Sequence, residues 1–335
     1  MCSHPIIPVP ITPYRTGSTE VDCVIDRYAT AVSDLAPLPS SRRLGASDLD
    51  VGPVAYGCWR LAGDLTSANA SIGAALDHGM TLIDTADIYG WDGARGFGDA
   101  EDLLGRVLAG APGWRDRMVL ATKGGIRPPV PYDQSRAYLR SAVEASLRRL
   151  RTETIDLYQV HRPDLLTGAV ELGSILDELV DSGKVRAIGV SNFSVGQHRA
   201  LAAHLRAPIC TTQPEWHPLR QEPLVDGTLD LCEETGCRPL VWSPLAGGRL
   251  TGSIVALDPD AARVATVAER IAAEQGVTRE AVLVAWIAHH PSGAIPIVGT
   301  TQPARIAAAA AATSVRLTRT EWYEVLVAGR GEPMP

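Results

Sequence analysis

Four polar residues, Asp84, Tyr89, Lys123 and His161, stand at or just after the ends of short apolar runs. A phenol ionises at about pH 10 and is a poor proton donor at neutral pH. A nearby ammonium group favours the phenolate, so Lys123 is expected to lower the pKa of Tyr89. Asp84 would keep Lys123 charged and oriented, and His161 would donate a hydrogen bond to a substrate oxygen. Such a set predicts the reduction of a C=O group, which also requires a source of hydride.

Each of these residues also has a purely structural interpretation. The segment LIDTADIYG, residues 82–90, fits a strand-to-helix turn in which Asp84 or Thr85 caps the next element. Lys123 would then face solvent, and His161 would be a hydrogen-bonded structural histidine. The choice between the two interpretations depends on whether the fold brings the four side chains together.

Short apolar runs alternate with helical patterns along most of the chain. Apolar residues recur at helical spacing in stretches such as ANASIGAALDHG, YLRSAVEASLRRL and LGSILDELVDSGK. The apolar runs are VAYGC (54–58), TLIDT (81–85), MVLATK (118–123), IDLYQVH (155–161), VRAIGVS (185–191), PICTTQ (208–213), RPLVWS (238–243) and AIPIVG (294–299). Eight strands that each precede a helix predict parallel strands buried on both faces, in a (β/α)₈ TIM barrel. The alternative, a doubly wound open sheet, calls for G-x-G-x-x-G after the first strand, and YGCWRLAG lacks it.

The two ends of the chain differ from this alternating pattern. Residues 1–38 contain several prolines and no sustained periodicity, which predicts a mobile N-terminal extension. Residues 39–335 are expected to form a single barrel domain. The segment SRRLGASDLDVGPVAYG predicts a β-hairpin that leads into the first strand, and LTRTEWYEVLVAGRG predicts a C-terminal helix on the barrel exterior.

The composition excludes several classes of partner and location. A net charge of -7 and a pI near 5.6 argue against nucleic acid or an anionic membrane as the main partner. The sequence contains no apolar stretch of about 18 residues, and its N-terminus lacks a basic leader. Six cysteines without CxxC spacing predict free thiols in a cytoplasmic protein. The sequence does not determine the oligomeric state.

The four residues and their surroundings resemble the catalytic tetrad of the aldo-keto reductases. The segments LIDTADIYG, ATKGG, DLYQVHRPD and KVRAIGVSNF each resemble segments of that family, in the same order. The resemblance runs from about residue 41 to the C-terminus, and the details VHRPD and WSPLAGGRL are most similar to the bacterial general oxidoreductases of the family. It implies that Tyr89 is the proton donor in an NADPH-dependent reduction of an aldehyde or ketone.

The resemblance also implies where NADPH (NADP+) would bind. The positions it assigns to the nicotinamide, the pyrophosphate and the adenosine 2′-phosphate are, along the chain, Trp59, Ser191, Asn192, Gln213, Trp216, Ser243, Leu245, Gly247, Arg249, Leu250, Gly299, Thr300, Thr301 and Arg305. Among these, Trp216 stands where the family commonly has a tyrosine that stacks on the nicotinamide. Ala308 and Ala309 occupy positions where the family often has Glu-Asn, so a preference for NADPH would rest largely on Arg305. Alternatively, Arg305 is a solvated arginine at a helix start.

The substrate is a small carbonyl compound in this interpretation. Trp59, Arg60 and Trp91 are candidate pocket residues, together favouring an aromatic or apolar compound, although Trp91 is equally well explained as a packing residue. Two other functions stay open: an NADPH-binding regulatory subunit without catalysis, and a metal-dependent hydrolase that uses Asp84 and His161. The hydrolase would need a further histidine or carboxylate cluster at neighbouring strand ends, and the sequence shows none.

Overall fold

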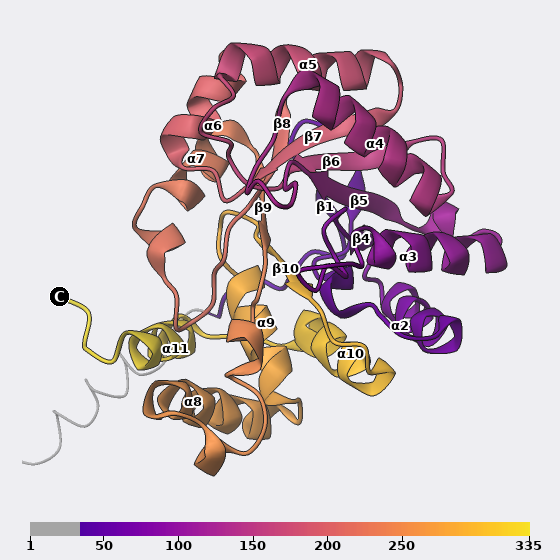
Figure 1. Cartoon of the computed structure of the whole chain (residues 1–335). Helices are drawn as coiled ribbons and strands as arrows, with labels where there is room; N and C mark the ends of the chain where they lie inside the picture. Colours follow the sequence, from indigo (N-terminus) through magenta and orange to yellow (C-terminus); the bar gives the residue numbers. More distant parts are fainter. Residues whose placement is uncertain (1–33) are drawn as a thin grey trace, which may run out of the picture.

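A closed barrel of eight parallel strands, surrounded by helices, is the central feature of the computed structural model, which describes residues 34–335 (Figure 1). The last strand pairs with both the preceding strand and the first, so the sheet has no edge. The strands are β3 (Ala55–Gly57), β4 (Leu82–Asp84), β5 (Val119–Gly124), β6 (Ile155–Val160), β7 (Val185–Ser191), β8 (Ile209–Gln213), β9 (Arg238–Val241) and β10 (Ile295–Val298). Seven of the eight predicted apolar runs contain one of these strands, and the run at 118–123 ends one residue before β5 does. The predicted TIM barrel is therefore confirmed, and the open-sheet alternative was wrong.

Amphipathic helices connect the strands and cover the barrel. They are α2 (Leu65–Asp77), α3 (Asp99–Gly110), α4 (Arg136–Leu150), α5 (Ala169–Asp181), α6 (Val195–Ala202), α7 (Thr228–Thr235), α8 (Pro259–Gln275), α9 (Arg279–Ala288), α10 (Pro303–Ala310) and α11 (Arg319–Arg330). Side chains cap the first turns of helices, as at the start of α4, where the Ser135 side chain accepts a hydrogen bond from the backbone N–H of Tyr138. Gly79 and Gly183, just after α2 and α5, have φ angles of 78° and 73°, the left-handed conformation that glycine favours at a helix end.

A β-hairpin closes the end of the barrel at which the strands begin. Its strands, β1 (Arg42–Arg43) and β2 (Asp50–Val51), pair antiparallel, as the sequence predicted. Leu44 and Leu49 of the hairpin belong to the same buried cluster as Leu82 and Leu157, which lie on barrel strands. The buried Arg42 guanidinium donates a hydrogen bond of 2.6 Å to the carbonyl oxygen of Ala288. Apolar side chains therefore fill the end of the barrel at which the strands begin.

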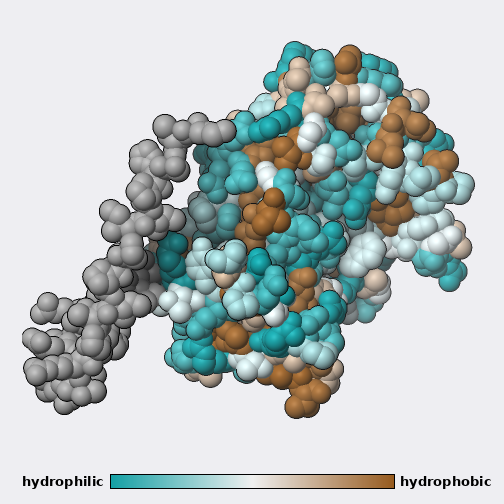
Figure 2. All heavy atoms as spheres, turned by 90° about the vertical axis from the view of Figure 1, so that its left-hand side faces the viewer, coloured by the Kyte–Doolittle hydropathy of each residue, from teal (hydrophilic) through white to brown (hydrophobic). Residues whose placement is uncertain are grey.

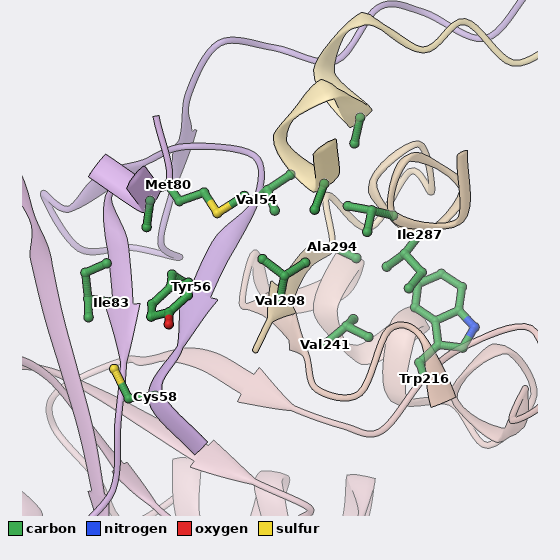
Figure 3. Close-up of a cluster of buried hydrophobic side chains, with 14 of the residues drawn as sticks. Val54, Tyr56, Cys58, Met80, Ile83, Trp216, Val241, Ile287, Ala294 and Val298 are labelled. Atoms are coloured by element: carbon green, nitrogen blue, oxygen red, sulfur yellow. The ribbon is translucent and has the colours of Figure 1, made fainter. Parts of the chain in front are cut away.

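A second, larger apolar cluster lies between the strands and the surrounding helices (Figure 3). The C-terminal helix α11 packs on α8 and α9, on the exterior of the barrel. Trp322 of α11 stacks on Trp286 of α9 at a ring distance of 5.0 Å, and each indole N–H donates to the backbone oxygen of the other residue at 2.9 Å. Two reciprocal hydrogen bonds therefore hold the end of the chain against the barrel.

The predicted N-terminal extension falls largely outside the described residues. At its described end, the backbone N–H of Leu35 donates to the oxygen of Leu317 at 2.8 Å, and Asp34 forms a bridge with Thr318.

The face of the molecule in Figure 2 is mostly hydrophilic, with hydrophobic residues in scattered small patches. Within residues 34–335, no helix has the length and apolar character needed to cross a membrane.

Candidate active site

The four candidate catalytic side chains converge at the end of the barrel opposite the hairpin. Asp84 is the last residue of β4, Lys123 lies near the end of β5, and His161 follows β6 directly. The Lys123 Nζ atom lies 2.6 Å from Asp84 Oδ2 and 4.7 Å from the centroid of the Tyr89 ring. The rings of Tyr89 and His161 meet edge to face, with centroids 5.8 Å apart. The carboxyl ends of parallel strands meet at one end of a barrel, which is why distant residues come together here.

The buried ion pair of Lys123 and Asp84 determines the charge of the site. Both side chains are almost fully shielded from solvent. Burial alone would lower the pKa of Lys123, but Asp84 and Tyr89 outweigh it and raise that pKa above its ordinary value. The ammonium also donates a hydrogen bond of 2.8 Å to the backbone oxygen of Thr85. Lys123 is therefore held charged beside Tyr89, and neither the solvent-facing Lys123 nor a helix-capping Asp84 describes this arrangement.

The pKa of Tyr89 differs from the sequence-based expectation. Burial raises it above the ordinary value, and the opposing effect of Lys123 is smaller, so the expected net lowering was wrong. A raised pKa keeps the phenol protonated at neutral pH, which suits a proton donor. The pKa of His161 is well below its ordinary value because of burial, Lys123 and Arg162. His161 is therefore a neutral imidazole, which donates from one ring nitrogen.

A cavity of about 610 Å³ opens above these residues. Asp84, Tyr89 and His161 line it, and its wall contains many of the positions predicted to hold a cofactor. Those predicted positions are Trp59, Ser191, Asn192, Gln213, Ser243, Leu245, Gly247, Gly299, Thr300, Thr301 and Arg305, and Arg60 also lines the cavity. The rings of Trp59 and Tyr89 meet edge to face, with centroids 5.0 Å apart.

Amides and hydroxyls cluster at the part of the cavity nearest the four residues. The Asn192 Nδ2 atom donates to Ser191 Oγ at 2.7 Å, and Ser191 Oγ donates to the backbone oxygen of Gln213 at 3.1 Å. Asn192 has a φ angle of 58°, in the left-handed region that asparagine tolerates better than most residues. This group matches the chemistry of a carboxamide, which both donates and accepts hydrogen bonds.

A glycine-rich turn and a cationic side chain form the other part of the cavity wall. Ser243 and Ala246 have φ angles of 54° and 52°, which are strained for residues with a Cβ and occur often at functional sites. Gly247, with φ 66°, accepts a hydrogen bond from the Arg60 guanidinium at 3.2 Å. Backbone of this kind suits a diphosphate, and Arg305 suits a further phosphate. The donor set therefore fits a nicotinamide dinucleotide.

The structure places four predicted site residues away from the cavity. Trp216 is fully buried in the outer apolar cluster (Figure 3). Its ring lies 5.3 Å from that of Trp286. Leu250 is fully buried in the apolar core, and Arg249 pairs with Asp258 at 3.0 Å. Trp91 packs on Phe97, in agreement with its alternative as a packing residue.

Trp242 and Arg162 are two of the cavity residues that the sequence did not predict. The Trp242 indole N–H donates to Asn192 Oδ1 at 3.1 Å, which places its ring beside the amide cluster. The Arg162 guanidinium lies 5.7 Å from the Trp242 ring. Both follow from the rule that strand ends face the site, because Trp242 precedes Ser243 and Arg162 follows His161.

Comparisons with known proteins show the family to which the chain belongs. The family model described as "Aldo/keto reductase family" matches residues 53–326, and the chain belongs to that family. Like other members, it is an NAD(P)H-dependent oxidoreductase that acts on carbonyl groups.

Several relatives are similar over nearly their whole length. A 6-dehydroglucose reductase of Novosphingobium aromaticivorans is 51% identical over 307 residues, which cover 91% of this chain and 100% of the relative. A 6-dehydroglucose reductase of Agrobacterium fabrum is 37% identical, with 87% and 99% covered. The structure of glycerol dehydrogenase AKR11B4 from Gluconobacter oxydans superimposes with a TM-score of 0.74 at 29% identity, covering 91% of this chain and 98% of that one.

Proposed function

We propose that this chain reduces an aldehyde to an alcohol with NADPH, and that Tyr89 is the general acid. The convergence of Tyr89 with the Lys123–Asp84 ion pair beneath one cavity carries the proposal. Bound NADPH would supply the hydride. Tyr89 gives its proton to the developing alkoxide, Lys123 stabilises the phenolate that results, and neutral His161 orients the oxygen by a hydrogen bond.

The names of the relatives favour a sugar aldehyde, 6-dehydroglucose, as the substrate. The cavity supports this choice, because the guanidinium of Arg162 beside His161 can donate to sugar hydroxyls. The rings of Trp59 and Trp242 instead supply apolar surface, which suits the aromatic or apolar compound predicted from the sequence.

A substrate panel tests this function directly. The oxidation of NADPH and of NADH is followed by absorbance with 6-dehydroglucose, short aliphatic aldehydes, aromatic aldehydes and ketones. The highest kcat/KM is expected with 6-dehydroglucose and NADPH. A higher value with an aromatic aldehyde would overturn the sugar assignment. Binding of NADPH without turnover of any compound would support the regulatory-subunit alternative.

The preference for NADPH over NADH is proposed to rest on Arg305. Arg305→Met is expected to raise the KM for NADPH about ten- to a hundredfold, because it removes a charged partner of the 2′-phosphate. The KM for NADH is expected to change less than twofold, as a rough bound, since NADH lacks that phosphate. Arg249→Met is the matched control, because Arg249 pairs with Asp258 away from the cavity. Equal effects of Arg305→Met on both cofactors would contradict the assignment.

Two further features belong to the same proposal. Residues 39–335 act as a single domain, which the pairing of β10 with β3 supports. The protein is cytoplasmic, in keeping with cysteines that show no CxxC spacing.

A further inference from the structure

A layer of buried polar side chains lies inside the barrel between the cavity and the apolar cluster at the hairpin end. Gln159 of β6 stands in this layer and is fully shielded from solvent. It does not line the cavity, so it would touch neither cofactor nor substrate. A buried amide is expensive to accommodate without hydrogen-bond partners, so the partners of Gln159 indicate what it does.

The Gln159 amide connects two parts of the site. Its Nε2 atom donates to Asp84 Oδ1 at 3.0 Å, and its Oε1 atom accepts from Gln213 Nε2 at 3.2 Å. Gln213 Nε2 also lies 3.2 Å from Asp84 Oδ1, which closes a triangle of hydrogen bonds. Thr211 Oγ1 donates to Gln159 Oε1 at 3.4 Å. Both polar atoms of the amide are therefore satisfied by residues of β4 and β8.

The barrel wall leaves room for this amide through a glycine on the neighbouring strand β7. A Cβ atom added at Gly189 would lie 2.9 Å from Gln159 Cγ and 2.1 Å from Thr211 Oγ1. Any larger residue at position 189 would displace the two side chains. The hydrogen bonds of Gln159 thus depend on a matched position in the adjacent strand.

We propose that Gln159 is a positioning residue that holds Asp84 and Gln213 in one arrangement, so that the proton donor and the nicotinamide end of the cavity are set together. This inference rests on the proposed function. Gln159 occupies Oδ1 of Asp84 and leaves Oδ2 for Lys123, and it fixes the amide of Gln213 beside the cavity. The hydrogen bond from Gln159 also disperses part of the negative charge of Asp84. The electrostatic potential that the Lys123–Asp84 ion pair produces at Tyr89 is therefore more positive.

The charged and titratable groups that face Tyr89 fix the expected direction of a pH effect. Lys123 of β5 lowers the pKa of Tyr89, whereas Asp84 of β4 and Cys58, which follows β3, raise it; His161 after β6 is neutral. Without the donor from Gln159, the charge of Asp84 is less dispersed. The pKa of Tyr89 then rises, and the loss of reductase activity at alkaline pH moves to higher pH.

Gln159→Met tests the proposal, because methionine has a similar length and lacks the amide. We expect kcat for aldehyde reduction to fall about ten- to a hundredfold, as for a small misplacement of reacting groups. We also expect the alkaline limb of kcat to move to higher pH and the Kd for NADPH, measured by fluorescence titration, to rise. Tyr158→Phe is the matched control, because Tyr158 is the preceding residue of β6 and its side chain packs in the outer core. Tyr158→Phe should leave both the alkaline limb of kcat and the Kd for NADPH as in the wild type.

An alkaline limb in Gln159→Met that coincides with those of the wild type and Tyr158→Phe would overturn the proposal, whatever happens to kcat. If Gln159→Met does not fold, Thr211→Val takes its place, since it removes the hydrogen bond that steadies Gln159 Oε1. A smaller shift in the same direction supports the proposal, and an unchanged profile overturns it. A wild-type protein that turns over no aldehyde would instead overturn the proposed function itself.

Discussion

Tyr89→Phe is expected to lower kcat for aldehyde reduction by about a hundredfold to ten-thousandfold, the usual contribution of a positioned general acid. The phenyl ring keeps the contacts of Tyr89 with Trp59 and His161 but has no proton to give. Steady-state kinetics with the best aldehyde of the panel measures the loss. The Kd for NADPH should stay within about twofold of the wild-type value, because the change removes no group assigned to the cofactor.

The matched change Tyr138→Phe removes the hydroxyl of a part-buried tyrosine, which donates to the backbone oxygen of Ile126 away from the cavity. It should leave kcat nearly unchanged. If Tyr89→Phe reduced the aldehyde at the wild-type rate, another residue would have to be the proton donor.

Asp84→Leu is expected to lower the free energy of unfolding by about 3–5 kcal/mol, the usual cost of leaving one member of a buried ion pair alone. Lys123 would lose its partner, and burial would then lower its pKa, so that it sheds its proton. Tyr89 would have no ammonium to stabilise its phenolate, and kcat should fall about a hundredfold or more. Urea unfolding and steady-state kinetics measure the two effects.

The double variant Asp84→Leu/Lys123→Met separates stability from catalysis. Replacing both members of a buried ion pair by apolar groups is often neutral for stability, so most of the lost unfolding free energy should return. Activity should stay low, because the ammonium is absent. Additive losses of unfolding free energy from the two single variants would show that Asp84 and Lys123 do not act as a pair.

The barrel and the four central residues could be predicted from the sequence because both depend on local signals. Each apolar run is short and bounded by polar residues, and the residues at the carboxyl end of a run lie at the site by the rule of parallel strands. Asp84, Lys123 and His161 all follow that rule. Tyr89 lies in the loop five residues after Asp84, so its expected place above the other three followed from theirs.

Trp216 and Trp242 show the limit of prediction from such local signals. Trp216 comes only three residues after Gln213, yet the chain turns outward there and its ring packs against Trp286. Trp242 instead follows β9 and lines the cavity. The strand-end rule brings Trp242 to the cavity, but it does not reach Trp216, because the direction of that ring is set by packing against Trp286 of the distant helix α9. The raised pKa of Tyr89 could not be predicted for a similar reason, because the burial of this side chain depends on the whole fold.

The hairpin of Arg42–Val51 has a consequence for the order of events in a catalytic cycle. Because apolar side chains obstruct the barrel from that side, both reactants must use the same entrance at the opposite end. Two molecules that share one entrance cannot exchange independently when one covers the other. Under the proposed function, a cofactor that reaches Gln213 would therefore have to bind before the aldehyde and leave after it.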